Sequence, residues 1–251
     1  MDLIAEAEQL VKAGAENGTM VRMLGGIAIA MRCPTAHTPN FKREYSDLDA
    51  VVPYQQRSQV DQVASQIGLE ADRAFNAHRG NERRCYYRSD GLKLDMFVEK
   101  FSMCHDVPLG ADRLSINGST VPLAELLLTK AQIVELTDKD AGDLFVLFHD
   151  HDVSADESGI SYVRIGEICG HDWGIWRTVS GTLKQLEAAV AHINTTDEER
   201  ALVTGRIERL LAEMDAAPKS RKWKMRSRVG ERKQWYVLPE EPNEAVDLRA
   251  L

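Results

Sequence analysis

The pattern of apolar and polar positions changes once along the chain. Up to about residue 122, short strand-like runs alternate with amphipathic helical segments, whereas from Leu123 onward the spacing is helical throughout. Strand side chains alternate between two faces and helical side chains repeat about every 3.6 residues, so this pattern predicts a short mixed sheet with helices and then a helical part. We expect an α/β fold. We place the domain boundary at Pro122, which gives domains 1–122 and 123–251.

In the first part, the pattern predicts a helix over residues 2–16, a strand over 20–24, a helix to about 32, a strand ending at 52 and a helix to about 68. Residues 83–88 and 92–98 flank Ser89-Asp90-Gly91, a typical hairpin turn. A shorter hairpin is expected around Asn117-Gly118, between 113–116 and 120–122. A polar loop rich in proline and threonine covers residues 33–44.

The second part predicts helices over residues 123–136, from 138 onward, 162–168, 173–193 and 197–214. Thr195 or Thr196 is a suitable N-cap for the last of these helices, because Glu198 and Glu199 follow in its first turn. Pro218 closes that helix. His149-Asp150-His151-Asp152 reads as a polar helix end rather than a metal site, since His149 and His151 do not share a helical face. His171-Asp172 is assigned to a helix start.

Residues 219–233, the basic aromatic segment, hold eight lysines and arginines against one glutamate. Trp223, Trp235 and Tyr236 are interleaved with or follow these charges. The segment is interpreted as a nucleic-acid contact, with backbone phosphates held by the cations and bases stacked on the tryptophans. The alternative is that the tryptophans pack against the helical domain and the charges are solvated.

Composition agrees with an ordinary globular protein, with 43% hydrophobic and 28% charged residues among 251. No apolar run reaches the roughly 20 residues of a membrane span. The acidic, amphipathic N-terminus does not resemble a signal peptide, and the four scattered cysteines suggest reduced thiols, so we expect a cytoplasmic protein with no membrane partner. The net charge of −8 argues against a generally basic surface but not against a local basic patch.

The strongest chemical signal is a pair of aspartates in a predicted strand. Asp47 and Asp49 are two residues apart and therefore point to the same face. Two carboxylates side by side in an apolar strand repel each other, and a divalent cation with a preference for oxygen ligands, such as Mg²⁺, relieves that repulsion. Gly25-Gly26 precedes this pair at a predicted helix start, and Asp95 lies in a later strand.

These three features, in this order, resemble the nucleotidyltransferase superfamily of the DNA polymerase β type. The chain is most similar to the AbiEii-like toxin group and its relatives. The matching segments are Leu24-Gly25-Gly26-Ile27-Ala28, Arg43-Glu44-Tyr45-Ser46-Asp47-Leu48-Asp49, Lys93-Leu94-Asp95-Met96-Phe97, Leu126-Leu127-Leu128-Thr129-Lys130, Lys139-Asp140 and Asp143-Leu144. The resemblance covers about the first 150 residues, and it implies a nucleotidyltransferase-like mixed sheet followed by a helical domain.

The resemblance implies an enzyme that moves a nucleoside monophosphate from a nucleoside triphosphate such as ATP to a hydroxyl, with release of pyrophosphate. Gly25 and Gly26 would bind phosphates through backbone N–H groups. Asp47 and Asp49 would hold two Mg²⁺ ions, and Asp95 would complete the metal site and accept the hydroxyl proton.

Three basic residues are further nucleotide-binding candidates, namely Arg43, Lys130 and Lys139. Two departures from the family stand out. Gly26 occupies a position where serine is common, and the loop over residues 33–44 lengthens the gap between the glycines and Asp47.

The acceptor is expected to be a tRNA end, as in a toxin that an antitoxin protein neutralises. The alternative acceptor is a small cationic molecule of the aminoglycoside kind, which the acidic net charge would attract. Outside this class, the chain would be a non-catalytic nucleotide- or RNA-binding protein, or a glycosyltransferase. The presence of all three carboxylates argues against the former, and Asp95 together with Gly25-Gly26 argues against the latter.

Overall fold

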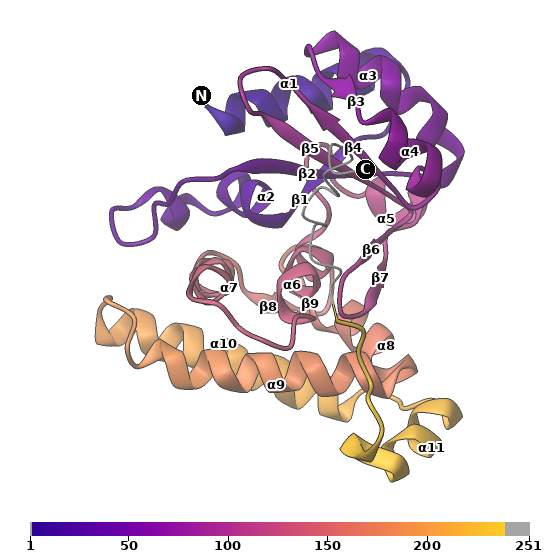
Figure 1. The fold of residues 1–251 in the computed structure, drawn as a ribbon. Coiled ribbons are helices and arrows are strands. Elements are labelled where there is room, and N and C mark those ends of the chain that lie inside the picture. Colours follow the sequence, from indigo (N-terminus) through magenta and orange to yellow (C-terminus); the bar gives the residue numbers. More distant parts are fainter. Residues whose placement is uncertain (1, 239–251) are drawn as a thin grey trace, which may run out of the picture.

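A five-stranded mixed sheet occupies the first part of the molecule in the computed structural model, which describes residues 2–238 (Figure 1). Its strands are β1 (Arg22–Leu24), β2 (Asp47–Val52), β3 (Glu70–Ala71), β4 (Arg83–Tyr87) and β5 (Lys93–Val98). They lie in the order β1-β2-β5-β4-β3. The pair β2–β5 is parallel and the other three pairs are antiparallel, so strands far apart in sequence meet at the centre of the sheet.

Helices cover both faces of this sheet. They are α1 (Leu3–Glu16), α2 (Gly25–Arg32), α3 (Val60–Gln66) and α4 (Arg73–Arg79), with the 3₁₀ turns η1 (Pro34–His37) and η2 (Tyr54–Gln59). In Figure 1, α1 and α3 lie above the sheet, while α2 packs between the sheet and the helices below it. Because both faces are covered, residues 94–98 of the central strand β5 are all buried.

The shorter hairpin predicted around Asn117-Gly118 is wrong. The chain instead forms the hairpin β6 (Lys100–Ser102) and β7 (Asp106–Pro108), and then the single-turn helix α5 (Ala111–Leu114). The Asn117 side chain accepts hydrogen bonds from the backbone N–H groups of Ser119 and Thr120. This turn directs Thr120 into a parallel bridge with Met23, so the segment extends the edge of the main sheet rather than pairing with itself.

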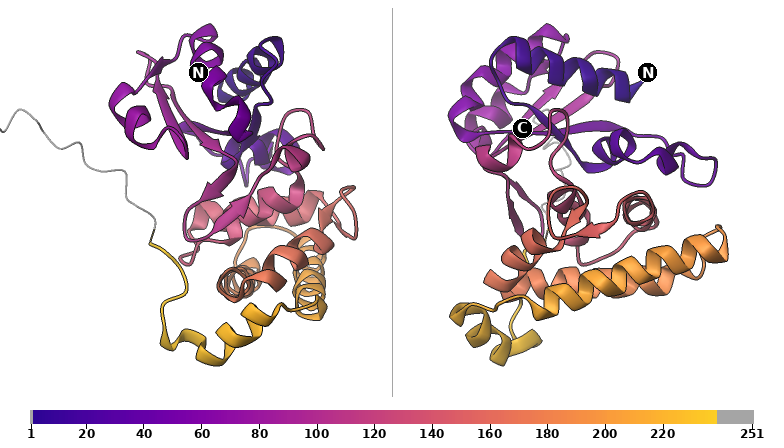
Figure 2. Two further views of the ribbon diagram at one scale, coloured as in Figure 1. Left: turned by 90° about the vertical axis from the view of Figure 1, so that its right-hand side faces the viewer. Right: turned by 180° about the vertical axis from the view of Figure 1, so that it is seen from behind.

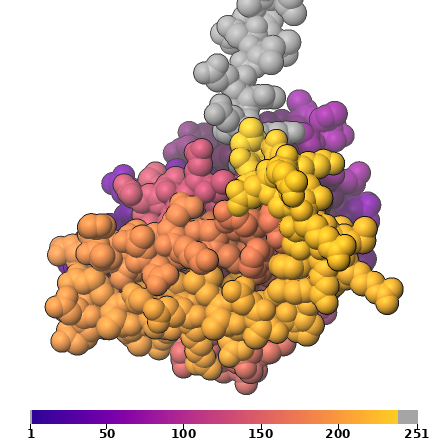
Figure 3. Space-filling model, turned by 90° about the horizontal axis from the view of Figure 1, so that it is seen from below, coloured from indigo at the N-terminus to yellow at the C-terminus, as the bar shows by residue number. Residues whose placement is uncertain are grey.

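The second part is helical. It consists of α6 (Leu123–Ala131), α7 (Asp138–Asp150), α8 (Tyr162–His171), α9 (Trp173–Val190), α10 (Asp197–Ala216), α11 (Arg221–Val229) and η3 (Gly230–Arg232), with a two-residue parallel pair, β8 (Val153–Ser154) and β9 (Ile160–Ser161). Figures 1 and 2 show the long helices α9 and α10 side by side at the end opposite the sheet. From below, α9, α10 and the C-terminal arm (residues 219–238) make up most of the visible surface (Figure 3).

Helix α6 joins the two parts and is almost entirely buried. Its Glu125 is fully buried and is bound by two arginines from different helices. Arg113 donates to both carboxylate oxygens at 2.6 and 2.9 Å, and Arg164 of α8 donates at 2.8 Å. A buried carboxylate needs such partners, and here they tie α5 and α8 to α6.

The expected fold class is confirmed at the level of a mixed α/β protein with a small mixed sheet flanked by helices. The strands that carry Asp47, Asp49 and Asp95 lie where the pattern predicted them. Helix α11 in the basic aromatic segment was not predicted.

All four cysteines are buried and free. Within residues 2–238, no helix is both long and apolar enough to cross a membrane.

Candidate active site

A glycine turn joins β1 to α2 and brings the backbone against β2. Gly25 has a φ of +70°, and a Cβ at this position would lie 2.6 Å from Oδ2 of Asp49. A Cβ at Gly26 would collide with the guanidinium of Arg43. The positive φ of Gly25 favours glycine there, whereas the contact at Gly26 is with the end of a flexible side chain that can move. Leu24 precedes α2 and offers no side-chain cap, so within the described chain no side chain satisfies the first N–H groups of this eight-residue helix.

Asp47 and Asp49 lie on one face of β2, beside this turn. Asp47 accepts a hydrogen bond from Ser46 Oγ at 3.0 Å. Within residues 2–238, the Asp49 carboxylate makes no hydrogen bond or ion pair, although the residue is partly buried. Burial, and then the neighbouring charges of Asp47 and Asp95, raise the pKa of Asp49 to about 7. Asp49 thus lacks a direct ion-pair partner among the described residues, and the more distant charges of Lys130 and Arg83 offset its raised pKa only in part.

Asp95 lies directly beside Asp49, because the parallel pairing of β2 and β5 puts these two residues in register. Its carboxylate is already paired. Arg83 Nη2 lies 2.7 Å and Lys93 Nζ 2.8 Å from its Oδ2 atom, and the Cys85 thiol donates to Oδ1. Burial by itself raises the pKa of Asp95, but the hydrogen bond and charge of Arg83, with smaller contributions from Cys85 and Lys93, bring the pKa below its ordinary value.

A second group of charges lies near the glycine turn, formed by Arg43 of the loop before β2 and by residues of α6 and α7. Arg43 forms two hydrogen bonds to Asp143 of α7, at 3.2 and 2.7 Å. Lys130 of α6 lies 2.9 Å from both Asp140 and Asp143. Burial lowers the pKa of Lys130, but the charges of Asp143 and Asp140 outweigh burial and raise it. Thr137 caps α7 and also donates to Asp140 at 2.7 Å.

These groups surround a hollow of about 210 Å³. Its lining includes most of the residues that sequence reasoning selected. They are Gly26, Arg43, Asp47, Asp49, Lys130 and Lys139, joined by Ile27, Tyr45, Ser46, Thr137 and Asp140. Gly25 lies against Asp49, and Asp95 lies next to Asp49 in the sheet. The structure therefore brings all eight predicted site residues to one place, although they span residues 25–139.

The donor set fits a divalent cation. Asp47 and Asp49 are hard oxygen donors on one strand face, and the missing counter-charge of Asp49 is what such a cation supplies. Within residues 2–238, no group of three or more histidine, cysteine, aspartate or glutamate side chains is arranged as a ready-made metal site. The carboxylate nearest to this pair, Asp95, is held by Arg83 and Lys93.

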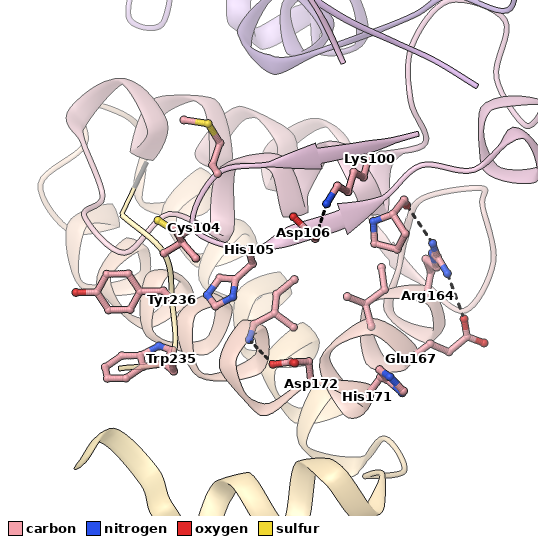
Figure 4. A pocket seen from close by; sticks show the side chains of 15 residues that line it. Lys100, Cys104, His105, Asp106, Arg164, Glu167, His171, Asp172, Trp235 and Tyr236 are labelled. Carbon is pink, nitrogen blue, oxygen red and sulfur yellow. Dashed lines mark hydrogen bonds and ion pairs between the residues drawn. The ribbon is translucent and has the colours of Figure 1, made fainter. Parts of the chain in front are cut away.

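A larger cleft, of about 820 Å³, lies between the β6–β7 hairpin, α8 and the C-terminal arm (Figure 4). None of the predicted site residues lines it. Several of its charged groups are already paired, as Lys100 is with Asp106 at 2.6 Å. His105 contacts the Thr178 hydroxyl through Nε2 at 2.8 Å, and burial lowers the pKa of this histidine.

The two histidine–aspartate motifs lie at helix boundaries: the first is a helix end and the second is at a helix start, as predicted. His149 and Asp150 close α7, where Thr35 donates to Asp150 through its backbone N–H at 2.8 Å and through its hydroxyl at 2.6 Å. Asp172 caps α9 by accepting hydrogen bonds from the N–H groups of Gly174 and Ile175.

The tryptophans of the C-terminal arm pack against α9. The rings of Trp223 and Trp176 meet edge to face with centroids 5.2 Å apart, and Trp235 meets Trp173 at 6.0 Å. Trp235 Nε1 also donates to Thr178 at 3.1 Å. These rings are therefore engaged within the protein, whereas the side chains of Lys224, Arg228, Arg232 and Lys233 are exposed.

A scan against protein-family models and a search of curated proteins both gave no match to this chain.

Sequence reasoning assigned no role to Arg83 or Lys93. The sequence does indicate that both could lie near Asp95. Lys93 is two residues before Asp95 in a predicted strand and so shares its face, and the hairpin turn places residues 83–88 opposite that strand. Asp140 and Asp143 were noted only as part of a family segment. Their spacing of three residues puts them on one helical face, where both reach Lys130.

Proposed function

We propose that the protein is a Mg²⁺-dependent nucleotidyltransferase with a fold of the DNA polymerase β type. The observation that carries this proposal is the Asp49 carboxylate, which has no direct ion-pair partner among the described residues and lies beside Asp47, against the glycine turn at the start of α2. A metal ion and a nucleoside triphosphate together would complement both the aspartate pair and the N-terminus of α2. The anionic phosphates suit the unsatisfied N–H groups of α2, and the cation suits the aspartate pair.

Each residue then has a physical role. Gly25 and Gly26 let the phosphates approach the backbone, and Arg43, Lys130 and Lys139 provide positive charge on the side of the helical part. Asp47 and Asp49 would hold two Mg²⁺ ions, and Asp95 lies beside them with its carboxylate paired to Arg83 and Lys93. When bound, these ions neutralise the triphosphate and the developing charge.

The reaction transfers a nucleotide to a hydroxyl. A bond forms between the acceptor oxygen and the α-phosphorus, the bond to the β-phosphate oxygen breaks, and pyrophosphate leaves. The acceptor proton goes to solvent. The lowered pKa of Asp95 makes this residue a weak base, so we assign it to binding and charge balance rather than to proton transfer.

We propose a tRNA end as the acceptor, with a cationic small molecule as the alternative. Exposed basic side chains on α11 and η3 support the RNA acceptor, because phosphate contacts dominate nucleic-acid affinity. The net charge of −8 supports the small cation. A toxin role, with an antitoxin protein as partner, rests on the resemblance to the toxin group.

The test is incubation of the protein with each α-labelled nucleoside triphosphate, Mg²⁺ and total tRNA. We expect label to move to RNA with wild type and with the control Asp112→Ala, an exposed aspartate on α5. With Asp47→Ala, we expect at least about a hundredfold loss. Label on a small-molecule acceptor alone would select the alternative acceptor. Wild type that neither binds a nucleotide nor transfers label would refute the function.

A further inference from the structure

One face of the sheet carries a mixed row of charges. Residues that are opposite in register share a face, so Asp47 lies beside Lys93, and Asp49 lies beside Asp95. On the far side of β5, Asp95 is opposite Cys85. Arg83 is two residues before Cys85 on β4 and hence on the same face. Two cations thus stand next to the aspartate pair, and neither of them lines the hollow that Arg43 and Lys130 line.

Arg83 and Lys93 bind the same oxygen, Oδ2 of Asp95, at 2.7 and 2.8 Å. Asp95 neutralises one of the two positive charges, and Asp47 and Asp49 lie close by on the same face. When a cation occupies the Asp47–Asp49 pair, Arg83 and Lys93 keep one positive charge that Asp95 does not balance. Arg43 and Lys130 differ in this respect, because Asp140 and Asp143 balance their two positive charges in direct ion pairs.

Hydrogen-bond donors also remain in this group. Arg83 uses Nε and Nη2 on Asp95, and within the described residues no partner is found for Nη1. Lys93 has three N–H donors and makes one ion pair. Their side chains are 34% and 27% exposed, so a ligand can reach them. The Phe97 ring, 5.2 Å from the guanidinium of Arg83, limits the motion of that side chain.

We propose that Arg83 and Lys93, anchored by Asp95, form a phosphate-binding position beside the Asp47–Asp49 pair. The ligand is a phosphate group, of either the nucleotide or the acceptor strand. The inference rests on the proposed function, since it adds a residue pair to the same site. Asp95 is then a positioning residue, which holds two mutually repelling cations close enough to bind one anion together.

The experiment measures equilibrium binding in the presence of Mg²⁺ with probes that cannot react, so that it does not depend on turnover. The probes are α,β-methylene ATP and a single-stranded oligoribonucleotide. The variants are Lys93→Gln, which keeps the two hydrogen bonds from Arg83 to Asp95, and Arg83→Gln. The matched controls are Lys12→Gln on α1 and Arg73→Gln on α4, both exposed. Melting temperatures report whether each variant is folded.

We expect both site variants to bind one of the two probes at least about tenfold more weakly, with a shallower salt dependence, and both controls to bind like wild type. Weaker binding of the ATP analogue places the phosphate on the nucleotide, and weaker binding of the oligonucleotide places it on the acceptor. If folded Lys93→Gln and Arg83→Gln bind both probes as wild type does, the inference is wrong.

The two proposals fail in different ways. Wild-type transfer that is lost in Asp47→Ala but unchanged in Lys93→Gln and Arg83→Gln would leave the nucleotidyltransferase standing and remove this phosphate position. Wild type that binds neither probe and transfers no label would remove both proposals.

Discussion

At the scale of single residues, the candidate site is best described by Asp49, a carboxylate that lacks a direct partner among the described residues. Its carboxylate lies against Gly25 and beside two other carboxylates, and within residues 2–238 it has no hydrogen bond of its own. Burying a charge without a partner is costly, so this residue weakens the folded state at neutral pH. A carboxylate with a raised pKa and no direct partner is a candidate for ligand binding.

The pH dependence of stability follows from the raised pKa. In the unfolded chain the aspartate titrates near 3.8, whereas in the folded protein its pKa is about 7. Between these values the folded protein holds a proton that the unfolded chain has lost, so stability falls as pH rises through this window, and the cost is complete above pH 7. We therefore expect Asp49→Asn to be more stable than wild type by about 4 kcal/mol at pH 8 and equally stable at pH 4.

Urea unfolding in EDTA at the two pH values measures this difference. Asp112→Asn, which changes an exposed aspartate, serves as the control and should follow wild type at both pH values. The same stability for Asp49→Asn and wild type at pH 8 would contradict the electrostatic argument.

At the scale of elements, two helices with threonine caps offer a matched comparison. Thr196 caps α10 in a reciprocal capping box with Glu199. Thr137 caps α7 and also donates to Asp140, which pairs with Lys130 in the candidate site. Thr196 does not line the hollow of the candidate site, whereas Thr137 does.

Replacing either threonine with alanine removes a hydrogen bond to an N-terminal N–H group, which lowers the free energy of unfolding by about 1 kcal/mol. Only Thr137→Ala should also weaken nucleotide binding, because Asp140 loses the hydroxyl that orients it toward Lys130. Urea unfolding and titration with the ATP analogue measure the two effects separately. Equal nucleotide affinity in both variants would mean that the Asp140–Lys130 pair does not shape the site.

At the scale of the whole molecule, the C-terminal arm combines an inner aromatic layer with an outer basic one. Trp223 packs edge to face on Trp176, and Arg226 lies over Trp173 with its guanidinium 4.7 Å from the ring centroid. The exposed cations point outward from the same elements. Stability and RNA binding should therefore depend on different residues of one segment.

Trp223→Ala should lower the free energy of unfolding by about 2 kcal/mol, since a half-buried ring loses its packing. Its effect on tRNA affinity in the folded protein should be small. Changing Lys224, Arg228 and Arg232 to glutamate should leave stability nearly unchanged and weaken tRNA binding at least about tenfold at 0.15 M salt. Filter binding over a range of salt concentrations measures the affinity. Unchanged tRNA binding in the triple variant, with small-molecule transfer intact, would favour the cationic acceptor.

Local patterns in the sequence determined much of this protein. Alternation along β2 put Asp47 and Asp49 on one face, and the capping residues and the 3.6-residue period located most helices. The paired glycines indicated the turn at Gly25. Such features depend on neighbours within a few residues, and the chain carries that information directly.

Only the tertiary structure decided how these elements meet. The parallel pairing of β2 with β5 placed Asp95 beside Asp49, and β4 brought Arg83 to the same carboxylate. The segment around Asn117 joined β1 instead of forming its own hairpin. The tryptophans of the arm packed on α9. These pairings join residues far apart in the chain, and the burial of the whole core selects them, which no short window of sequence can specify.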